Sequence, residues 1–260
     1  MKNIILDMTG LCRDGGLERS LGSPEIVGLA SLEGTNCYCD DSAASAIRDA
    51  ISGLPVRALH WIDTGDYHYL SRLWLEKAAA ELGDEPFALV LFDHHPDMQE
   101  PAFGKVLSCG GWARDAFCGI PNLTQALLVG INPDLEVEIL DLVFDGVLAV
   151  TTDDLRHTGD ALSQEVLEMF SLLDPHIPVY ISIDKDVLTK EYARTNWDQG
   201  CMTLPQLEAA VRRVAAGHRL LGADICGGLT RDKGGNDADF EVNLSTDEAL
   251  EKLFANLIID

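Results

Sequence analysis

Three residues that could bind a metal follow one apolar run of the sequence. Asp93, His95 and Asp97 come directly after residues 87–92, whose unbroken apolar character is typical of a strand buried on both faces. An extended backbone sends alternate side chains to the same side, so these three side chains can converge at the end of the strand. Two carboxylates beside an imidazole are costly unless a cation or a proton neutralises them. The simplest interpretation is a metal site.

A second stretch repeats this arrangement. Residues 177–183 form another apolar run, and Asp184 and Asp186 follow it at the same spacing of two. In a parallel sheet both strand ends lie at one edge, where open α/β folds bind their ligands. We therefore expect the two groups to meet in space.

The ligand types indicate which cation and which chemistry to expect. A site rich in carboxylate oxygens favours manganese over zinc, whereas thiolate sites favour zinc. Two ions that share bridging carboxylates can hold a water between them and lower its pKa, which makes hydroxide near neutral pH. Such a nucleophile would attack the planar carbon of a guanidinium, an amidine or an amide.

The rest of the chain alternates apolar strand patterns with amphipathic helix patterns. This alternation predicts a mostly parallel sheet of about seven or eight strands, with helices on both faces, and a single α/β domain over residues 1–260. Predicted N-caps are Asp41 or Ser42 for the first helix and Thr203 for a later one. The predicted strands are residues 2–8, 56–62, 87–92, 125–130, 146–150, 177–183 and 220–225. The predicted helices are residues 43–52, 71–82, 112–117, 135–142, 161–173, 204–216 and 246–257.

Composition limits the possible partners. The chain has 43 acidic and 19 basic residues and a net charge of −24, which argues against binding of nucleic acid or an anionic membrane surface. The N-terminal segment lacks a signal-peptide pattern, and no apolar run is long enough to cross a bilayer. Seven scattered cysteines fit a reducing compartment better than a disulfide framework. We expect a cytoplasmic protein that acts on a small molecule.

Three motifs together resemble those of a known family. Asp93-His-His-Pro-Asp97 resembles the Asp-x-His-x-Asp signature of the arginase and agmatinase (ureohydrolase) family, and Ser182-Ile-Asp-Lys-Asp186 resembles its Ser-x-Asp-x-Asp signature. Gly65-Asp-Tyr-His68 is similar to an earlier Gly-Gly-Asp-His element of that family. The resemblance extends from about Val56 to Ile225.

The resemblance implies a three-layer α-β-α sandwich with two manganese ions per chain, hydrolysis of a carbon–nitrogen bond by a metal-bridging hydroxide, and self-association. It implies that Asp93 and Asp184 bridge the two ions and that His94 points away from them. The implied ligands are His68, Asp93, Asp97 and Asp184 for one ion, and Asp93, His95, Asp184 and Asp186 for the other.

The sequence departs from the family pattern at three places. Tyr67 separates His68 from the preceding aspartate, where the family has no insertion. Cys109 stands where the family commonly has a proton-shuttling histidine, and glycine stands at the position of its guanidinium-anchoring glutamate, within Asp224-Ile-Cys-Gly-Gly228. We take Asp97, which would orient the hydroxide, and Cys109, if its pKa suits a general acid, as the catalytic candidates.

Plainer structural roles stay open at this point. Asp93, His95 and Asp97 are also consistent with a solvated turn, and Asp184 and Asp186 with a helix cap. His68 would then be an ordinary loop residue.

Three other functions are also consistent with these motifs. They are a haloacid-dehalogenase-like phosphatase built on Asp184, a zinc-dependent deacetylase of the same fold, and a non-catalytic metal-binding arginase-fold protein. Only 74 residues follow Asp186, too few for the rest of the phosphatase core.

Overall fold

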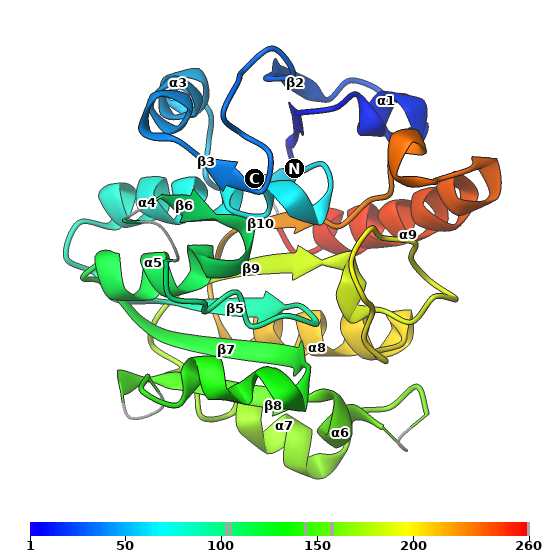
Figure 1. Cartoon of the computed structure of the whole chain (residues 1–260). Coiled ribbons are helices and arrows are strands. Elements are labelled where there is room, and N and C mark those ends of the chain that lie inside the picture. Colours follow the sequence, from blue (N-terminus) through cyan, green and yellow to red (C-terminus); the bar gives the residue numbers. More distant parts are fainter. Residues whose placement is uncertain (102–103, 105, 143–144, 157–158, 259–260) are drawn as a thin grey trace.

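A parallel sheet of eight strands forms the centre of the molecule (Figure 1). The computed structural model describes residues 1–101, 104, 106–142, 145–156 and 159–258. The strand order is β2-β1-β4-β10-β9-β5-β7-β8, and every neighbouring pair is parallel. The strands are β1 (Asn3–Asp7), β2 (Glu25–Gly28), β4 (Leu59–Trp61), β5 (Phe87–Phe92), β7 (Leu123–Ile131), β8 (Val147–Thr151), β9 (Val179–Asp184) and β10 (Leu220–Cys226). A separate antiparallel pair joins β3 (Tyr38–Cys39) to β6 (Leu107–Ser108).

Helices cover both faces of this sheet, and each face has its own apolar core. One core packs against α3 (Asp41–Ile51), α4 (Leu70–Leu82) and α5 (Trp112–Gly119). The other packs against α7 (Gln164–Phe170), α8 (Leu204–Gly217) and α9 (Asp237–Ala255). Shorter helices are α1 (Leu11–Asp14), α2 (Leu17–Ser20) and α6 (Thr152–Leu155), with 3₁₀ turns η1 (Gly65–Tyr67), η2 (Cys109–Gly111), η3 (Pro133–Ile139), η5 (Lys185–Val187) and η6 (Arg231–Lys233). The predicted three-layer α-β-α sandwich is confirmed.

The strands that carry the candidate ligands lie at the centre of the sheet. Strand β5 pairs with β9, and every residue of both strands is buried. Burial of an aromatic side chain such as Phe87 or Phe92 contributes about 1.5–3 kcal/mol, so this pairing is strongly favoured. Because the two strands are parallel, their carboxyl ends lie side by side.

Several element boundaries differ from those predicted. Helix α9 begins at Asp237, nine residues before the predicted start, because Asn236 forms a capping box with Asp239. Residues 133–139 form a 3₁₀ helix where we predicted an α-helix over residues 135–142. The N-cap of α3 is Asp40, which accepts a hydrogen bond from the Ala43 amide, and neither Asp41 nor Ser42 has this role. Thr203 caps α8 as predicted.

No helix among the described residues combines the length and the apolar character that crossing a membrane would require. The assignment of residues 1–260 to a single domain stays a prediction.

Candidate metal centre

The predicted ligands lie at the carboxyl ends of three strands, β4, β9 and β5, with β10 between β4 and β9. His68 follows β4 through η1, and Asp184 is the last residue of β9. Asp93 follows β5 directly, and Asp186 lies two residues beyond β9. The structure brings all six predicted ligands to this edge of the sheet, in three groups whose candidate ligand atoms lie within 4.8 Å of one another.

The first group consists of His68, Asp93 and Asp97, all buried. Nδ1 of His68 lies 3.1 Å from Oδ2 of Asp93 and 3.1 Å from Oδ2 of Asp97. Two ligand atoms at a right angle on one ion, each about 2.1 Å from it, lie about 3.0 Å apart. The spacing of the group therefore matches three ligands of one cation.

Local backbone structure places two of these side chains. The 3₁₀ turn Gly65–Tyr67 ends at His68 and directs the imidazole inward, so the extra Tyr67 is accommodated. Asp97 has a φ of +51°, in the left-handed region, so the residues after β5 turn instead of continuing as the extended segment we predicted. Its carbonyl accepts hydrogen bonds from the amides of Ala113 and Arg114, and its Oδ2 accepts one from Trp112 Nε1 at 2.6 Å.

The second group consists of Asp93, His95 and Asp186. Nδ1 of His95 lies 3.0 Å from Oδ2 of Asp186 and 3.5 Å from Oδ1 of Asp93. Nε2 of His95 lies 3.1 Å from Oδ1 of Asp198, a carboxylate that can orient the ring. Asp93 uses one oxygen in this group and the other in the first group, so it joins the two.

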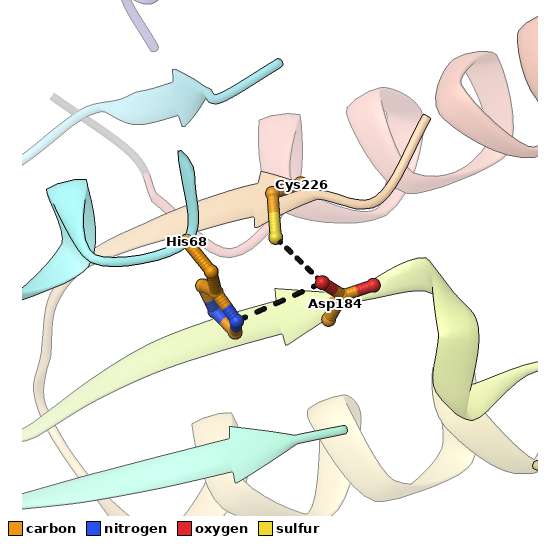
Figure 2. A group of neighbouring side chains, drawn as sticks. All are labelled: His68, Asp184 and Cys226. Atoms are coloured by element: carbon orange, nitrogen blue, oxygen red, sulfur yellow. Dashed lines mark hydrogen bonds and ion pairs between the residues drawn. The ribbon is translucent and has the colours of Figure 1, made fainter. Parts of the chain in front are cut away.

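The third group joins His68 and Asp184 to Cys226 (Figure 2). Oδ2 of Asp184 lies 3.7 Å from Nδ1 of His68 and accepts a hydrogen bond from Cys226 Sγ at 3.0 Å. Oδ1 of Asp184 accepts a hydrogen bond from the Asp186 amide, so the carboxylate also caps the 3₁₀ turn after β9. Asp184 therefore acts as a cap and is a member of the cluster at the same time.

His94 is directed elsewhere. Its Nδ1 lies 3.4 Å from the carbonyl of Gly130 and its Nε2 lies 3.7 Å from a carboxylate oxygen of Asp198. It belongs to none of the three groups formed by the described residues.

A hydrogen-bond relay holds one edge of the His68 ring. Ser182 donates its single hydroxyl proton to Oδ1 of Asp224 at 2.6 Å, and Nε2 of His68 lies 2.9 Å from the same hydroxyl oxygen. The hydroxyl can therefore accept a hydrogen bond from Nε2–H, which directs Nδ1 toward the carboxylates. Nδ1 is buried and makes no hydrogen bond, although two carboxylate oxygens lie 3.1 Å away. Burial alone would lower the pKa of His68, but the neighbouring Cys226, Asp93 and Asp97 outweigh this and raise it, so the imidazole takes up either a proton or a cation at this place.

The pKa shifts of the clustered side chains also indicate a site that favours positive charge. Burial raises the pKa values of Asp97 and Asp184, and together with the charge of Asp93 it raises the pKa of Asp186 to about 6. Burial alone would lower the pKa of His95, but its contacts with Asp186 and Asp93 outweigh this and raise it. The cluster is stabilised by added cations or protons.

The sequence of residues 44–227 matches the model of the arginase family. The chain belongs to the arginase family. An uncharacterized protein of Thermotoga maritima (strain ATCC 43589 / DSM 3109 / JCM 10099 / NBRC 100826 / MSB8) is 31% identical over 224 residues, which cover 86% of this chain and 78% of that protein. Members of the family are hydrolases of carbon–nitrogen bonds that use a binuclear metal cluster.

Solved structures of arginase-family enzymes share the fold. Proclavaminate amidino hydrolase from Streptomyces clavuligerus has a TM-score of 0.72 and 19% identity, over 99% of this chain and 92% of that one. Formimidoylglutamase from Bacillus subtilis subsp. subtilis str. 168 has a TM-score of 0.67 and 16% identity, over 98% and 86%. Arginase from Bacillus caldovelox has a TM-score of 0.66 and 16% identity, over 96% and 98%.

A cavity of about 290 Å³ opens above the metal-ligand cluster of this arginase-family chain. Its walls include Gln99, Cys109 and Trp197 in addition to the candidate ligands. Burial, followed by the charge of Asp97, raises the pKa of Cys109, so its thiol stays protonated at neutral pH. The predicted catalytic cysteine thus faces the cavity as a neutral group.

Two residues of the cluster were absent from the predicted ligand set. Cys226 stands two residues after Asp224 at the end of β10, the same spacing that pointed to Asp184 and Asp186, so this signal was available. Asp198 comes from the loop between residues 192 and 200, and no spacing rule relates it to His95. Only the fold places it there.

Proposed function

We propose that this chain is a binuclear manganese hydrolase of the ureohydrolase type, which cleaves a carbon–nitrogen bond of a guanidino, amidine or amide small molecule. The ligands are His68, Asp93, His95, Asp97, Asp184 and Asp186. The proposal extends the family's general chemistry to a specific metal and to named residues.

One observation supports this proposal most directly. Asp93 contributes Oδ2 to the group with His68 and Oδ1 to the group with His95. A carboxylate shared in this way suits a bridge between two neighbouring cations, although its Oδ1 also accepts a hydrogen bond from the His95 amide at 2.7 Å. Asp184 is proposed as the second bridge, although its carboxylate lies in one group only, with His68 and Cys226.

The side chains around the cluster then have distinct roles. Two bound cations supply a water of lowered pKa as the nucleophile. Asp97, whose Oδ2 is fixed by Trp112 and whose pKa burial raises, would hold one cation and hydrogen-bond to the water that the cations bind. His95, oriented by Asp198, fixes the second cation position. The cavity of about 290 Å³ limits the substrate to a small molecule.

The sequence predicts that the substrate contacts differ from those of arginases and agmatinases at Gly227. This glycine occupies the apparent position of the guanidinium-anchoring glutamate, so this anchor is missing. A panel of substrates must therefore include neutral amides and amidines as well as guanidines. A cytoplasmic location and self-association also stay predictions.

The test combines metal analysis with turnover. Protein stripped with a chelator and reloaded with Mn²⁺ is expected to hold two ions per chain and to release ammonia, urea or an amine from a member of the panel. Asp93→Asn should lose both the ions and the activity, whereas Asp84→Asn, a change at an exposed carboxylate outside the cluster, should lose neither.

Other results would favour the alternatives. A single tightly bound zinc with deacetylase activity would favour the deacetylase. Two ions without turnover of any substrate class would favour the non-catalytic member. Retention of both ions by Asp93→Asn would contradict the ligand assignment.

A further inference from the structure

Cys226 lies inside the metal-ligand cluster, although the proposed function gives it no role. It ends β10 in register with Asp184 of the neighbouring strand β9, and its side chain is buried. Figure 2 shows its sulfur directed at the Asp184 carboxylate, on the same side as His68. Sγ, the Asp184 carboxylate oxygen and the His68 ring nitrogen lie within 4.8 Å of one another.

The distances fit a sulfur and an oxygen bound to one ion. With bonds of about 2.1 Å to oxygen and about 2.3 Å to sulfur, the two ligand atoms of one ion lie about 3.1 Å apart at the right angle of a five- or six-coordinate site and about 3.6 Å apart at the tetrahedral angle. The observed separation between Sγ of Cys226 and Oδ2 of Asp184 is 3.0 Å. A thiol that merely donates a hydrogen bond to Asp184 would have a similar separation, so a second observation is needed.

That observation is the unpartnered Nδ1 of His68. The ring is buried, its Nε2 is engaged by Ser182, and Nδ1 makes no hydrogen bond. A buried histidine nitrogen without a hydrogen bond, in one group with a thiol and a carboxylate, forms the nitrogen–oxygen–sulfur donor set that zinc and cobalt prefer.

We propose that Cys226 is a direct sulfur ligand of the cation held by His68 and Asp184. This inference rests on the proposed binuclear centre and changes its metal preference. As the metal–sulfur bond forms, the thiol S–H bond breaks and its proton leaves to solvent, with no change in oxidation state. This position then favours Zn²⁺, Co²⁺ or Fe²⁺, whereas the position of Asp93, His95 and Asp186, which has no sulfur, favours Mn²⁺. The chain thus has one soft and one hard metal position.

Cobalt provides a direct test, because a thiolate bound to Co²⁺ absorbs in the near ultraviolet by charge transfer. Titration of metal-free protein with Co²⁺ is expected to produce this band, and Cys226→Ser is expected to abolish it while still binding Co²⁺. Cys109→Ser is the matched control, because Cys109 is a second thiol beside the same cavity and its loss should leave the band unchanged.

Metal selectivity gives a second measurement. Since even outer partners of a ligand change metal affinity about 10- to 100-fold, loss of a direct ligand should lower Zn²⁺ affinity at least about tenfold. Mn²⁺ affinity should change less, so the Zn²⁺/Mn²⁺ preference falls in Cys226→Ser. X-ray absorption at the zinc edge of the wild-type protein, which needs no variant, should show a sulfur about 2.3 Å from the metal.

The outcomes separate this inference from the proposed function. Two bound ions with no charge-transfer band and no sulfur neighbour would overturn the sulfur ligand and leave the binuclear centre standing. A band that persists in Cys226→Ser would also overturn it. Failure of the wild-type protein to bind Co²⁺, Zn²⁺ or Mn²⁺ would overturn both.

Discussion

Nε2 of His68 lies 2.9 Å from the hydroxyl oxygen of Ser182, on the side of the ring away from the carboxylate cluster. The Ser182 hydroxyl in turn donates a hydrogen bond to Asp224. Burial raises the pKa of Asp224 to about 6, so this carboxylate is still ionised at neutral pH and can accept the proton. The relay fixes the orientation of His68. A metal-binding histidine depends on such a partner for its basicity.

Ser182→Ala is predicted to weaken metal binding without removing a ligand. The ring of His68 loses its acceptor, so its Nδ1 is no longer held toward the cluster. Affinity for one of the two ions should fall about 10- to 100-fold, as measured by competition with a chelator. Ser23→Ala, at an exposed serine, serves as the control. Equal affinities in wild type and Ser182→Ala would refute the relay.

Gly227→Ala is predicted to disturb Asp184 by direct contact. A Cβ at Gly227 would lie 2.2 Å from Oδ1 of Asp184 and 2.7 Å from the Lys185 amide nitrogen, at a φ of +86°. Metal affinity should fall at least about tenfold, because the carboxylate must move. The same contact predicts that Gly227→Glu does not gain guanidine hydrolysis.

Gly234→Ala is the matched control for this variant. Gly234 has a φ of +99°, but no atom lies within 4 Å of the point that its Cβ would occupy, so only the backbone cost of about 1–2 kcal/mol applies. Its metal affinity should equal that of the wild type. If Gly227→Ala binds metal as well as Gly234→Ala does, the steric argument fails.

The stability of the metal-free protein is predicted to rise as the pH falls from 7 to 5. The folded pKa of Asp186 is about 6 against an ordinary 3.8, and those of Asp97 and Asp184 are also raised. The folded state therefore holds more protons than the unfolded chain in this range, which stabilises it on acidification; Asp186 alone contributes up to about 3 kcal/mol over its full range.

Saturating metal should reverse this dependence, because protons then compete with the cations for the same oxygens. Urea unfolding at several pH values, with and without Mn²⁺, measures both slopes. His60, whose pKa burial lowers to about 4, contributes equally to the two forms, so the difference between them isolates the cluster. Identical slopes with and without metal would contradict the prediction.

Asp247→Ala is predicted to destabilise the protein by about 3–5 kcal/mol, because it leaves a buried ammonium without its partner. Lys185 lies between Asp184 and Asp186, and its Nζ is 2.6 Å from Oδ1 of Asp247, with both side chains buried. The double variant Lys185→Met/Asp247→Leu should recover most of the loss in urea unfolding. A loss below about 1 kcal/mol in the single variant would mean that the pair is solvated.

Much of the site could be predicted from the sequence, because most of its ligands lie directly after the ends of strands. The run that became β5 has the bounds that its apolar pattern predicts, and Asp93 follows it directly. Asp97 reaches the cluster for a different reason from the one predicted. Its left-handed backbone is held by amides of α5, and neither this contact nor the 3₁₀ turn that delivers His68 can be inferred from alternation along a strand.

The parts of the site that the sequence did not predict depend on contacts between segments that are far apart in the chain. Asp198 meets His95 across 103 residues, and Ser182 meets Asp224 across 42, because the fold brings a loop and two strands to one edge. The predicted start of α9 was wrong because the first turns of this helix are polar. The cap at Asn236 determines where the helix begins. Local pattern indicates which residues can bind, whereas the fold decides which of them meet.

A crystal structure of protein grown with manganese, with anomalous scattering recorded for the metal, tests the central claim most directly. We expect two metal peaks about 3.5–4 Å apart, each bonded to a different oxygen of Asp93. A single peak, or two peaks of which only one contacts Asp93, would contradict the shared-carboxylate centre.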